Sequence, residues 1–216
     1  MNELYFSTLV LSRHHKYAEV WAHREWVVSQ LIAGHPPRVY EYERDDAWIV
    51  QYCSDQHPRN YPCWAYRTSV FKLLGAVGGV EKSIEWMTED ALNFMARHVS
   101  DCSCTSFLCT VIRIQLPKWS AVLLWKRMLQ FNTRLIVQSV NEGKNYGALW
   151  EARRNLISTH WQCGPLFGGW TLEEELDFVV VCCEFPGVDA AKYGLWLVHS
   201  ISPVTFSSVV TNSPNA

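Results

Sequence analysis

Three cysteines come closest to a metal-ligand spacing in this 216-residue chain. Cys102 and Cys104 are separated by one residue, and Cys109 follows within the same apolar segment. A catalytic zinc needs three Cys, His or Asp/Glu ligands that converge around an open coordination position. These cysteines instead lie on the apolar stripe of a predicted helix, which favours a structural role over a metal site. We therefore predict no metal site in this chain.

Histidines and a run of acids are the other residues whose types could carry chemistry. No carboxylate-rich segment accompanies His14, His15 and His23, so solvated or helix-capping roles are favoured over a metal site or a catalytic base. The run Glu173-Glu174-Glu175 follows Thr171, and acids suit the positive end of a helix dipole. We predict an exposed first helical turn there, with docking of a basic protein as the alternative.

The composition is that of a globular protein with no general affinity for nucleic acid. The chain has 49% hydrophobic and 19% charged residues and a formal net charge of -2. Nucleic-acid binding rests on clustered, uncompensated Lys and Arg. No apolar stretch reaches the roughly 20 residues that a membrane span needs. The eight cysteines are scattered, so we predict reduced thiols in a cytoplasmic protein.

Several of the eleven tryptophans recur at a fixed period. Trp21 and Trp64 each open the pattern Trp-x-(His/Tyr)-Arg, 43 residues apart. Another copy is centred on Trp150, and a degenerate copy lies before it, with Thr105 in place of tryptophan and Leu108 in place of arginine. The successive copies are therefore 41 to 45 residues apart.

The residues around each tryptophan repeat the stripe of an amphipathic helix. In the first copy they are Val20, Trp21, Arg24, Val27 and Val28, a spacing with a period near 3.6. We predict that each copy is the second helix of a hairpin, with repeat cores at about 15–31, 58–74, 99–116 and 144–160. First helices are expected at 2–13 and about 38–55, 79–97, 118–141 and 171–185, with breaks at Pro36-Pro37 and Gly75 to Gly79.

Neighbouring helical hairpins bury each other's faces. The sequence therefore predicts an all-α protein, an α-solenoid of about four to five helical hairpins that forms a single domain over 1–201. A last unit is expected at 170–201, and a flexible tail at 202–216.

The repeated aromatic and basic residues are predicted to be structural. Each tryptophan would bury about 200 Å² between hairpins. Each arginine lies one turn further on the same face, where a guanidinium needs an acceptor such as a carboxylate or helix-end carbonyls. Recurrence in several copies favours structural pairing over substrate contact. These repeat residues are Trp21, Arg24, Trp64, Arg67, Trp150 and Arg153.

The segment Pro58-Arg59-Asn60-Tyr61-x-x-Trp64-x-Tyr66-Arg67 resembles the repeat signature of protein prenyltransferase alpha subunits, P-K-N-Y-x-x-W-x-H-R. The first copy is similar to it from Lys16 to Arg24, with Tyr17-Ala18 in place of Asn-Tyr. The segment HVSDCS at 98–103 resembles one branch of the family, the prenyltransferase alpha-subunit-repeat-containing proteins. The resemblance spans roughly 2–160.

The resemblance implies a crescent of hairpins around a beta subunit, which would bind the zinc and the isoprenoid diphosphate, with no cofactor in this chain. It places Lys16 at the motif position that lies near the diphosphate, Arg59 one repeat later, and Tyr61 on the same face. This branch is taken to pair with the Rab geranylgeranyltransferase beta subunit. The implied reaction is geranylgeranyl transfer to a protein cysteine near a C-terminus, without activity for this chain alone.

A non-catalytic helical-repeat scaffold is the alternative. Tyr17-Ala18 replaces the Asn-Tyr pair of the signature, and the copy around Thr105 lacks both tryptophan and arginine. Lys16 and Tyr61 on the same concave groove would favour the enzyme subunit, and scattered positions would favour the scaffold.

Overall fold

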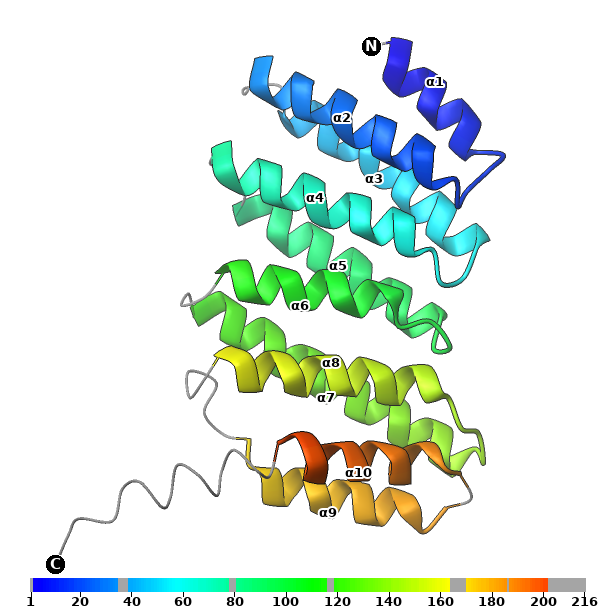
Figure 1. The fold of residues 1–216 in the computed structure, drawn as a ribbon, viewed down its shortest axis with the longest axis vertical. Coiled ribbons are helices and arrows are strands. Elements are labelled where there is room, and N and C mark those ends of the chain that lie inside the picture. The colour runs from blue at the N-terminus through cyan, green and yellow to red at the C-terminus, as the bar shows by residue number, and fades with distance from the viewer. Residues whose placement is uncertain are drawn as a thin grey trace, which may run out of the picture. The chain divides into compact units, whose positions relative to one another are not determined.

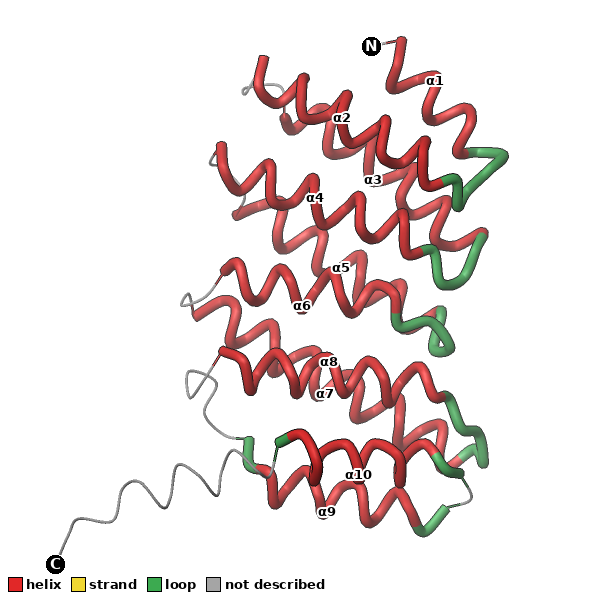
Figure 2. Tube along the Cα trace, viewed as in Figure 1, coloured by secondary structure: helices red, strands yellow, loops and turns green. Residues whose placement is uncertain are grey.

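A computed structural model describes residues 2–34, 39–77, 81–115, 119–163, 170–185 and 187–201. In these ranges the chain forms ten α-helices and no β-strand (Figures 1 and 2), which confirms the all-α class. The helices are α1 (Asn2–Leu11), α2 (Ala18–Gly34), α3 (Val39–Gln56), α4 (Tyr61–Val77), α5 (Glu81–Arg97), α6 (Ser103–Gln115), α7 (Trp119–Asn141), α8 (Gly147–Cys163), α9 (Leu172–Cys183) and α10 (Asp189–Ser200).

Consecutive helices pack in pairs, so the predicted helical hairpins are confirmed. We number the pairs α1–α2, α3–α4, α5–α6, α7–α8 and α9–α10 as hairpins 1 to 5. The chain divides into two compact units, unit 1 over Met1–Gln115 and unit 2 over Leu116–Ala216. A single domain over 1–201 stays a prediction. The predicted tail at 202–216 and the break at Pro36-Pro37 lie outside the described residues.

Second helices form the centre of each unit. In unit 1, α4 packs against α2 on one side and α6 on the other, and in unit 2, α8 packs against α10 (Figure 1). The repeat tryptophans lie in these contacts. Trp21 is 2% exposed, with its ring centre 5.0 Å from that of Tyr66, and the Trp150 ring lies 5.4 Å from that of Tyr193.

The degenerate copy in hairpin 3 has an apolar interior without the usual tryptophan. Thr105 and Leu108 are both fully buried in α6. Phe107 from the same helix lies 5.9 Å from the Trp64 ring and 6.1 Å from the Phe71 ring. Phe107 therefore contacts Trp64 from the position at which Tyr66 contacts Trp21, two residues after the tryptophan site.

Candidate functional site

The residues assigned by the resemblance lie on the loops that connect first and second helices in unit 1. Lys16 is exposed in the loop between α1 and α2. Arg59 is exposed in the loop between α3 and α4, and Tyr61, which begins α4, is 57% exposed. These loops follow one another along the same edge of unit 1 (Figure 1).

Asn60 joins the first two of these loops. Its side-chain amide donates to the backbone carbonyl of His15 at 2.9 Å and to that of Cys53 at 3.1 Å. Its carbonyl oxygen accepts from the backbone N–H of Cys63 at 3.3 Å, which caps α4. Because His15 precedes Lys16 and Asn60 precedes Tyr61, this buried amide holds the two predicted contact residues on adjoining segments.

Asp101 occupies the position in hairpin 3 that Asn60 occupies in hairpin 2. Its carboxylate accepts from the backbone N–H of Arg59 at 2.5 Å and from the N–H and hydroxyl of Ser103 at 2.8 and 2.6 Å. The Asn60 amide thus donates to a backbone carbonyl of the preceding hairpin, whereas the Asp101 carboxylate accepts from a backbone N–H of the preceding hairpin. Arg59 has a positive φ of 56°, which orients the peptide before it so that its N–H faces Asp101.

His15 lies under the same edge within an aromatic cluster. Its ring centre lies 5.0 Å from that of His57 and 5.5 Å from that of Tyr52, and Tyr52 stacks on Trp48 at 5.4 Å. Burial, with smaller contributions from His57 and His14, lowers the pKa of His15 below its usual value. The imidazole therefore favours its neutral form beside Lys16.

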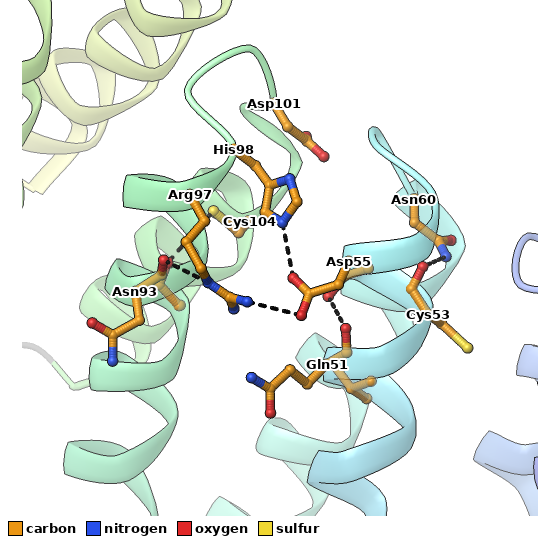
Figure 3. Close-up of polar contacts among 12 residues, drawn as sticks. Gln51, Cys53, Asp55, Asn60, Asn93, Arg97, His98, Asp101 and Cys104 are labelled. Carbon is orange, nitrogen blue, oxygen red and sulfur yellow. Dashed lines mark hydrogen bonds and ion pairs between the residues drawn. The ribbon is translucent and has the colours of Figure 1, made fainter.

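A second polar cluster joins hairpins 2 and 3. The Asp55 carboxylate of α3 accepts from the Arg97 guanidinium at 2.9 Å and pairs with the His98 Nε2 at 2.8 Å (Figure 3). The His98 ring stacks on Phe94 with centres 4.4 Å apart. These side chains are partly exposed, so the cluster orders the loop edge more than it stabilises the core.

The arginine of hairpin 1, Arg24, belongs to a buried network across four helices. Its Nε donates to Asp46 of α3 at 2.9 Å, and the hydroxyl of Tyr66 in α4 donates to the same carboxylate oxygen at 2.6 Å. Another guanidinium nitrogen of Arg24 donates to the α1 hydroxyls of Ser7 and Thr8, both at 2.9 Å. Arg24 thus fixes α1 to α2 and hairpin 1 to hairpin 2.

The arginine of hairpin 4 builds the same kind of centre in unit 2. Two Arg153 nitrogens contact the two oxygens of Glu175 at 2.5 and 2.8 Å. Glu175 also accepts from the Tyr193 hydroxyl at 2.8 Å and the Trp170 indole N–H at 3.0 Å. Burial and the Glu175 charge raise the pKa of Tyr193, so its hydroxyl stays a donor. We call an arginine, the acid it meets on the following hairpin and the tyrosine or aromatic ring beside them an arginine centre.

The centre of hairpin 2 uses a ring in place of the tyrosine hydroxyl. Arg67 donates to Asp90 of α5 at 2.6 Å, and its guanidinium carbon lies 5.3 Å from the centre of Phe107. Phe107 stands where hairpin 2 has Tyr66 and hairpin 5 has Tyr193. Hairpin 3 has Leu108 at its arginine position, and hairpin 4 has Ala152 at its tyrosine position. Neither side chain carries a charge or a hydroxyl group.

The structure corrects the prediction for Glu175. We expected the whole acidic run to be an exposed first turn, but Glu175 is 2% exposed and pairs with Arg153. Glu174 does lie in the first turn, in a capping box with Thr171. Spacing could have identified Glu175, because the arginine and acid are 22, 23 and 22 residues apart in the three centres.

Three of the buried cysteines lie in an environment that disfavours the thiolate. Cys104 is fully buried, and burial raises its pKa well above the usual range, as it also does for Cys63. The pKa of Cys53 is raised to about 12 for the same reason. Within the described ranges, no group of three or more His, Cys, Asp or Glu residues could hold a metal ion. The described helices also include none with the length and apolar character to cross a membrane.

The first repeat matches a known family. Residues 1–31 match the family described as "Protein prenyltransferase alpha subunit repeat", and this segment contains α1, Lys16 and the Trp21–Arg24 pair. The chain therefore carries a repeat of the protein prenyltransferase alpha-subunit repeat family. A comparison with curated proteins found no match.

Proposed function

We propose that this chain is the alpha-type, non-zinc subunit of a heterodimeric protein prenyltransferase that transfers a geranylgeranyl group to protein cysteines. The observation that carries the proposal is the alpha-subunit repeat at 1–31, joined to four further helical hairpins among the described residues. The zinc and the isoprenoid diphosphate would be bound on a beta subunit of the Rab geranylgeranyltransferase type.

In this proposal the loop edge of unit 1 contributes positive charge near the diphosphate. Departure of the diphosphate from an allylic carbon builds up negative charge, which fixed cations stabilise. Lys16 and Arg59 are exposed cations on loops that Asn60 and Asp101 hold in place. Tyr61 begins the helix next to them and offers an exposed phenol. We propose Lys16 as the main diphosphate contact, with Arg59 and Tyr61 beside it.

Co-expression with a Rab-type geranylgeranyltransferase beta subunit tests the proposal. We expect a stable heterodimer that transfers labelled geranylgeranyl to proteins ending in cysteine, and no transfer by this chain alone. Lys16→Ala should lower kcat of the heterodimer about tenfold or more, as the loss of one charged contact to the leaving group does. Lys72→Ala, at an exposed lysine of α4 away from the loops, should leave it unchanged.

A non-catalytic helical-repeat scaffold is the second candidate, and hairpin 3 supports it. Thr105 and Leu108 are buried where the family signature has tryptophan and arginine, so the array has diverged at its middle. A folded chain that binds no beta subunit would favour the scaffold. An active heterodimer whose transfer rate is the same with Lys16→Ala would contradict only the assignment of Lys16 to the diphosphate.

A further inference from the structure

The loop between α1 and α2 directs one peptide carbonyl into the molecule. The carbonyl of His15 accepts from the side-chain amide of Asn60 in hairpin 2 at 2.9 Å and from the Trp21 indole N–H at 2.8 Å. Asn60 is fully buried and Trp21 is 2% exposed, so this carbonyl faces inwards. The N–H of a trans peptide lies opposite its carbonyl. The Lys16 N–H is therefore directed away from both donors.

The equivalent peptide in the loop between α3 and α4 has the opposite orientation. Pro58 and Arg59 lie 43 residues after His15 and Lys16. Here the N–H of Arg59 faces the next hairpin, where an oxygen of the Asp101 carboxylate accepts from it at 2.5 Å. The Pro58 carbonyl belongs to the same peptide, so it is directed away from Asp101.

The backbone of Arg59 shows the cost of this reversal. Type I and type II turns differ by a rotation of their central peptide through about half a turn, which makes φ of the following residue positive. Among the described non-glycine residues a positive φ is found at Arg59, at 56°, and not at its counterpart Lys16. A residue with a Cβ adopts this left-handed region unfavourably. A favourable contact must therefore hold Arg59 there.

A buried indole shows a second cost. Trp64 lies 43 residues after Trp21 and is 3% exposed, and no described residue accepts a hydrogen bond from its Nε1. The acceptor of the Trp21 indole is the His15 carbonyl, and the equivalent carbonyl, that of Pro58, has turned away. A buried donor without an acceptor is unfavourable. The reversed peptide therefore accounts for both the unpaired indole and the left-handed Arg59.

The side chain that faces each peptide explains its orientation. Asn60 has an amide that donates to a carbonyl, whereas a carboxylate only accepts. Asp101 is 4% exposed, and its other oxygen accepts from the N–H and hydroxyl of Ser103, which fixes the carboxylate in place. A Pro58 carbonyl turned inwards would put two acceptors in contact. The Arg59 N–H instead forms a charge-assisted hydrogen bond, which offsets both costs of the reversal.

We propose that Asp101 is a positioning residue, whose carboxylate holds the Pro58–Arg59 peptide reversed. Asparagine in its place would return this peptide to the orientation of His15–Lys16, because an amide can donate to the Pro58 carbonyl as Asn60 donates to that of His15. The choice between Asn and Asp at this position of the repeat thus decides which backbone group each loop directs outwards.

The consequence for a ligand rests on the proposed function. Backbone N–H groups attract an anion, whereas a carbonyl oxygen carries partial negative charge and repels it. The loop of hairpin 1 can therefore offer a diphosphate both the backbone N–H and the side-chain charge of Lys16. The loop of hairpin 2 offers the side-chain charge of Arg59 beside an unfavourable carbonyl. Asp101 thereby concentrates recognition of the diphosphate on hairpin 1.

NMR of the indole N–H groups in the full chain tests the orientation of the peptide. The Trp64 signal should lie upfield of the Trp21 signal, because only the Trp21 proton is hydrogen-bonded. Asp101→Asn should move the Trp64 signal downfield, since the returned Pro58 carbonyl accepts from it. Trp21→Phe and Trp64→Phe assign the two signals. Asp55→Asn is the matched control and should produce no downfield shift, because this carboxylate of the same loop edge pairs with other side chains.

Glycine at position 59 gives an independent measurement. Glycine adopts a positive φ without the steric penalty of a Cβ, so Arg59→Gly should raise the urea midpoint of unit 1 while Asp101 is present. In the Asp101→Asn background the same change should lower the midpoint, because residue 59 returns to a negative φ and glycine then adds only flexibility to the unfolded chain. Lys16→Gly is the control and should lower the midpoint in both backgrounds.

Transfer by the heterodimer tests the consequence for the diphosphate. Asp101→Asn should lower KM for the isoprenoid diphosphate about threefold or more beyond the effect of Asp55→Asn, as one added hydrogen bond does. Both variants remove one negative charge from the loop edge, but only Asp101→Asn turns the Arg59 N–H outwards. Equal KM values in the two variants would contradict the role in diphosphate recognition.

The measurements on the chain alone separate this inference from the proposed function. A heterodimer that does not form or transfer would contradict the proposed function and leave the NMR and urea results to decide the role of Asp101. A Trp64 signal unmoved by Asp101→Asn, or an equal effect of Arg59→Gly in both backgrounds, would overturn the positioning role. If Asp101→Asn does not fold, a downfield Trp64 signal or a destabilising Arg59→Gly in the otherwise unaltered chain would overturn it.

Discussion

The arginine centres of the two units use one design but bury the acid to different degrees. Two nitrogens of Arg153 contact the two oxygens of Glu175, whose side chain is 1% exposed. Arg24 contacts Asp46 through Nε and directs another nitrogen at the hydroxyls and a carbonyl of α1. Both arginines also donate to their own hairpin, Arg153 to the hydroxyl of Thr133 in α7 at 2.8 Å and Arg24 to the two hydroxyls of α1. The two centres therefore differ mainly in how deeply the acid is buried.

This difference in burial predicts how much stability each unit loses when its arginine is removed. Removing one partner of a buried ion pair leaves the other charge without compensation, and that penalty grows with burial. In unit 2 the acid left behind would be almost inaccessible to water. The side chain of Asp46 in unit 1 is 8% exposed, against 1% for Glu175, and each acid would keep the hydrogen bond from its tyrosine. The two units should therefore respond unequally to loss of the arginine.

Loss of Arg153 should have the largest effect. Arg153→Met should lower the free energy of unfolding of unit 2 by about 3 to 5 kcal/mol, because Glu175 would stay buried as an uncompensated carboxylate. Urea denaturation, followed by tryptophan fluorescence, measures this free energy of unfolding. Arg154→Ala, which removes an exposed pair with Glu151 at 3.7 Å, is the control and should change stability by about 0.5 kcal/mol or less. A similar loss in both variants would contradict the account of the buried centre.

Loss of the arginines in unit 1 should cost less and should rank by burial of the acid. Arg24→Met should lower the free energy of unfolding by about 2 to 4 kcal/mol. Arg67→Met should lower it less, because the side chain of Asp90 is 17% exposed and that of Asp46 is 8% exposed. Urea denaturation of the two variants gives the comparison. The interpretation fails if Arg67→Met is the more destabilising change.

Loss of the tyrosine hydroxyl should have a smaller effect that is similar in the two units. Tyr66→Phe and Tyr193→Phe each remove one hydrogen bond to a buried carboxylate while the ring stays in place, and each should cost about 1 to 2 kcal/mol. Thermal melts measure both. Phe107 shows that a ring alone is tolerated at this position beside Arg67, so a loss as large as that of the arginine would be unexpected.

Lowering the pH should produce the smallest loss of stability, and His160 of unit 2 should contribute to that loss. Burial between Trp125 and Trp170 lowers the pKa of His160, so the unfolded chain takes up the proton first as pH falls. The neutral imidazole therefore contributes fully above about pH 6.5 and progressively less below it. The difference in Tm between pH 7.5 and 5.5 should shrink in His160→Gln. The exposed His199→Gln should retain the whole difference.

Sequence periodicity identified the second helices well and the polar partners poorly. The stripe around Trp21, Trp64 and Trp150 lies on α2, α4 and α8, since an amphipathic helix requires that local spacing. The arginines were expected to need acceptors, but Asp46, Asp90 and Glu175 were not identified. The loop contacts of Asn60 and Asp101 were missed as well, because each reaches a backbone group in another hairpin.

The sequence by itself determined the class of fold, the repeat and the need of each buried arginine for a partner, because apolar spacing and the cost of burying a charge are local properties. Only the tertiary structure decided which acid meets which arginine. That outcome depends on how one hairpin stacks on the next, because stacking brings together an arginine and an acid 22 or 23 positions apart, beyond the spacing within one helix.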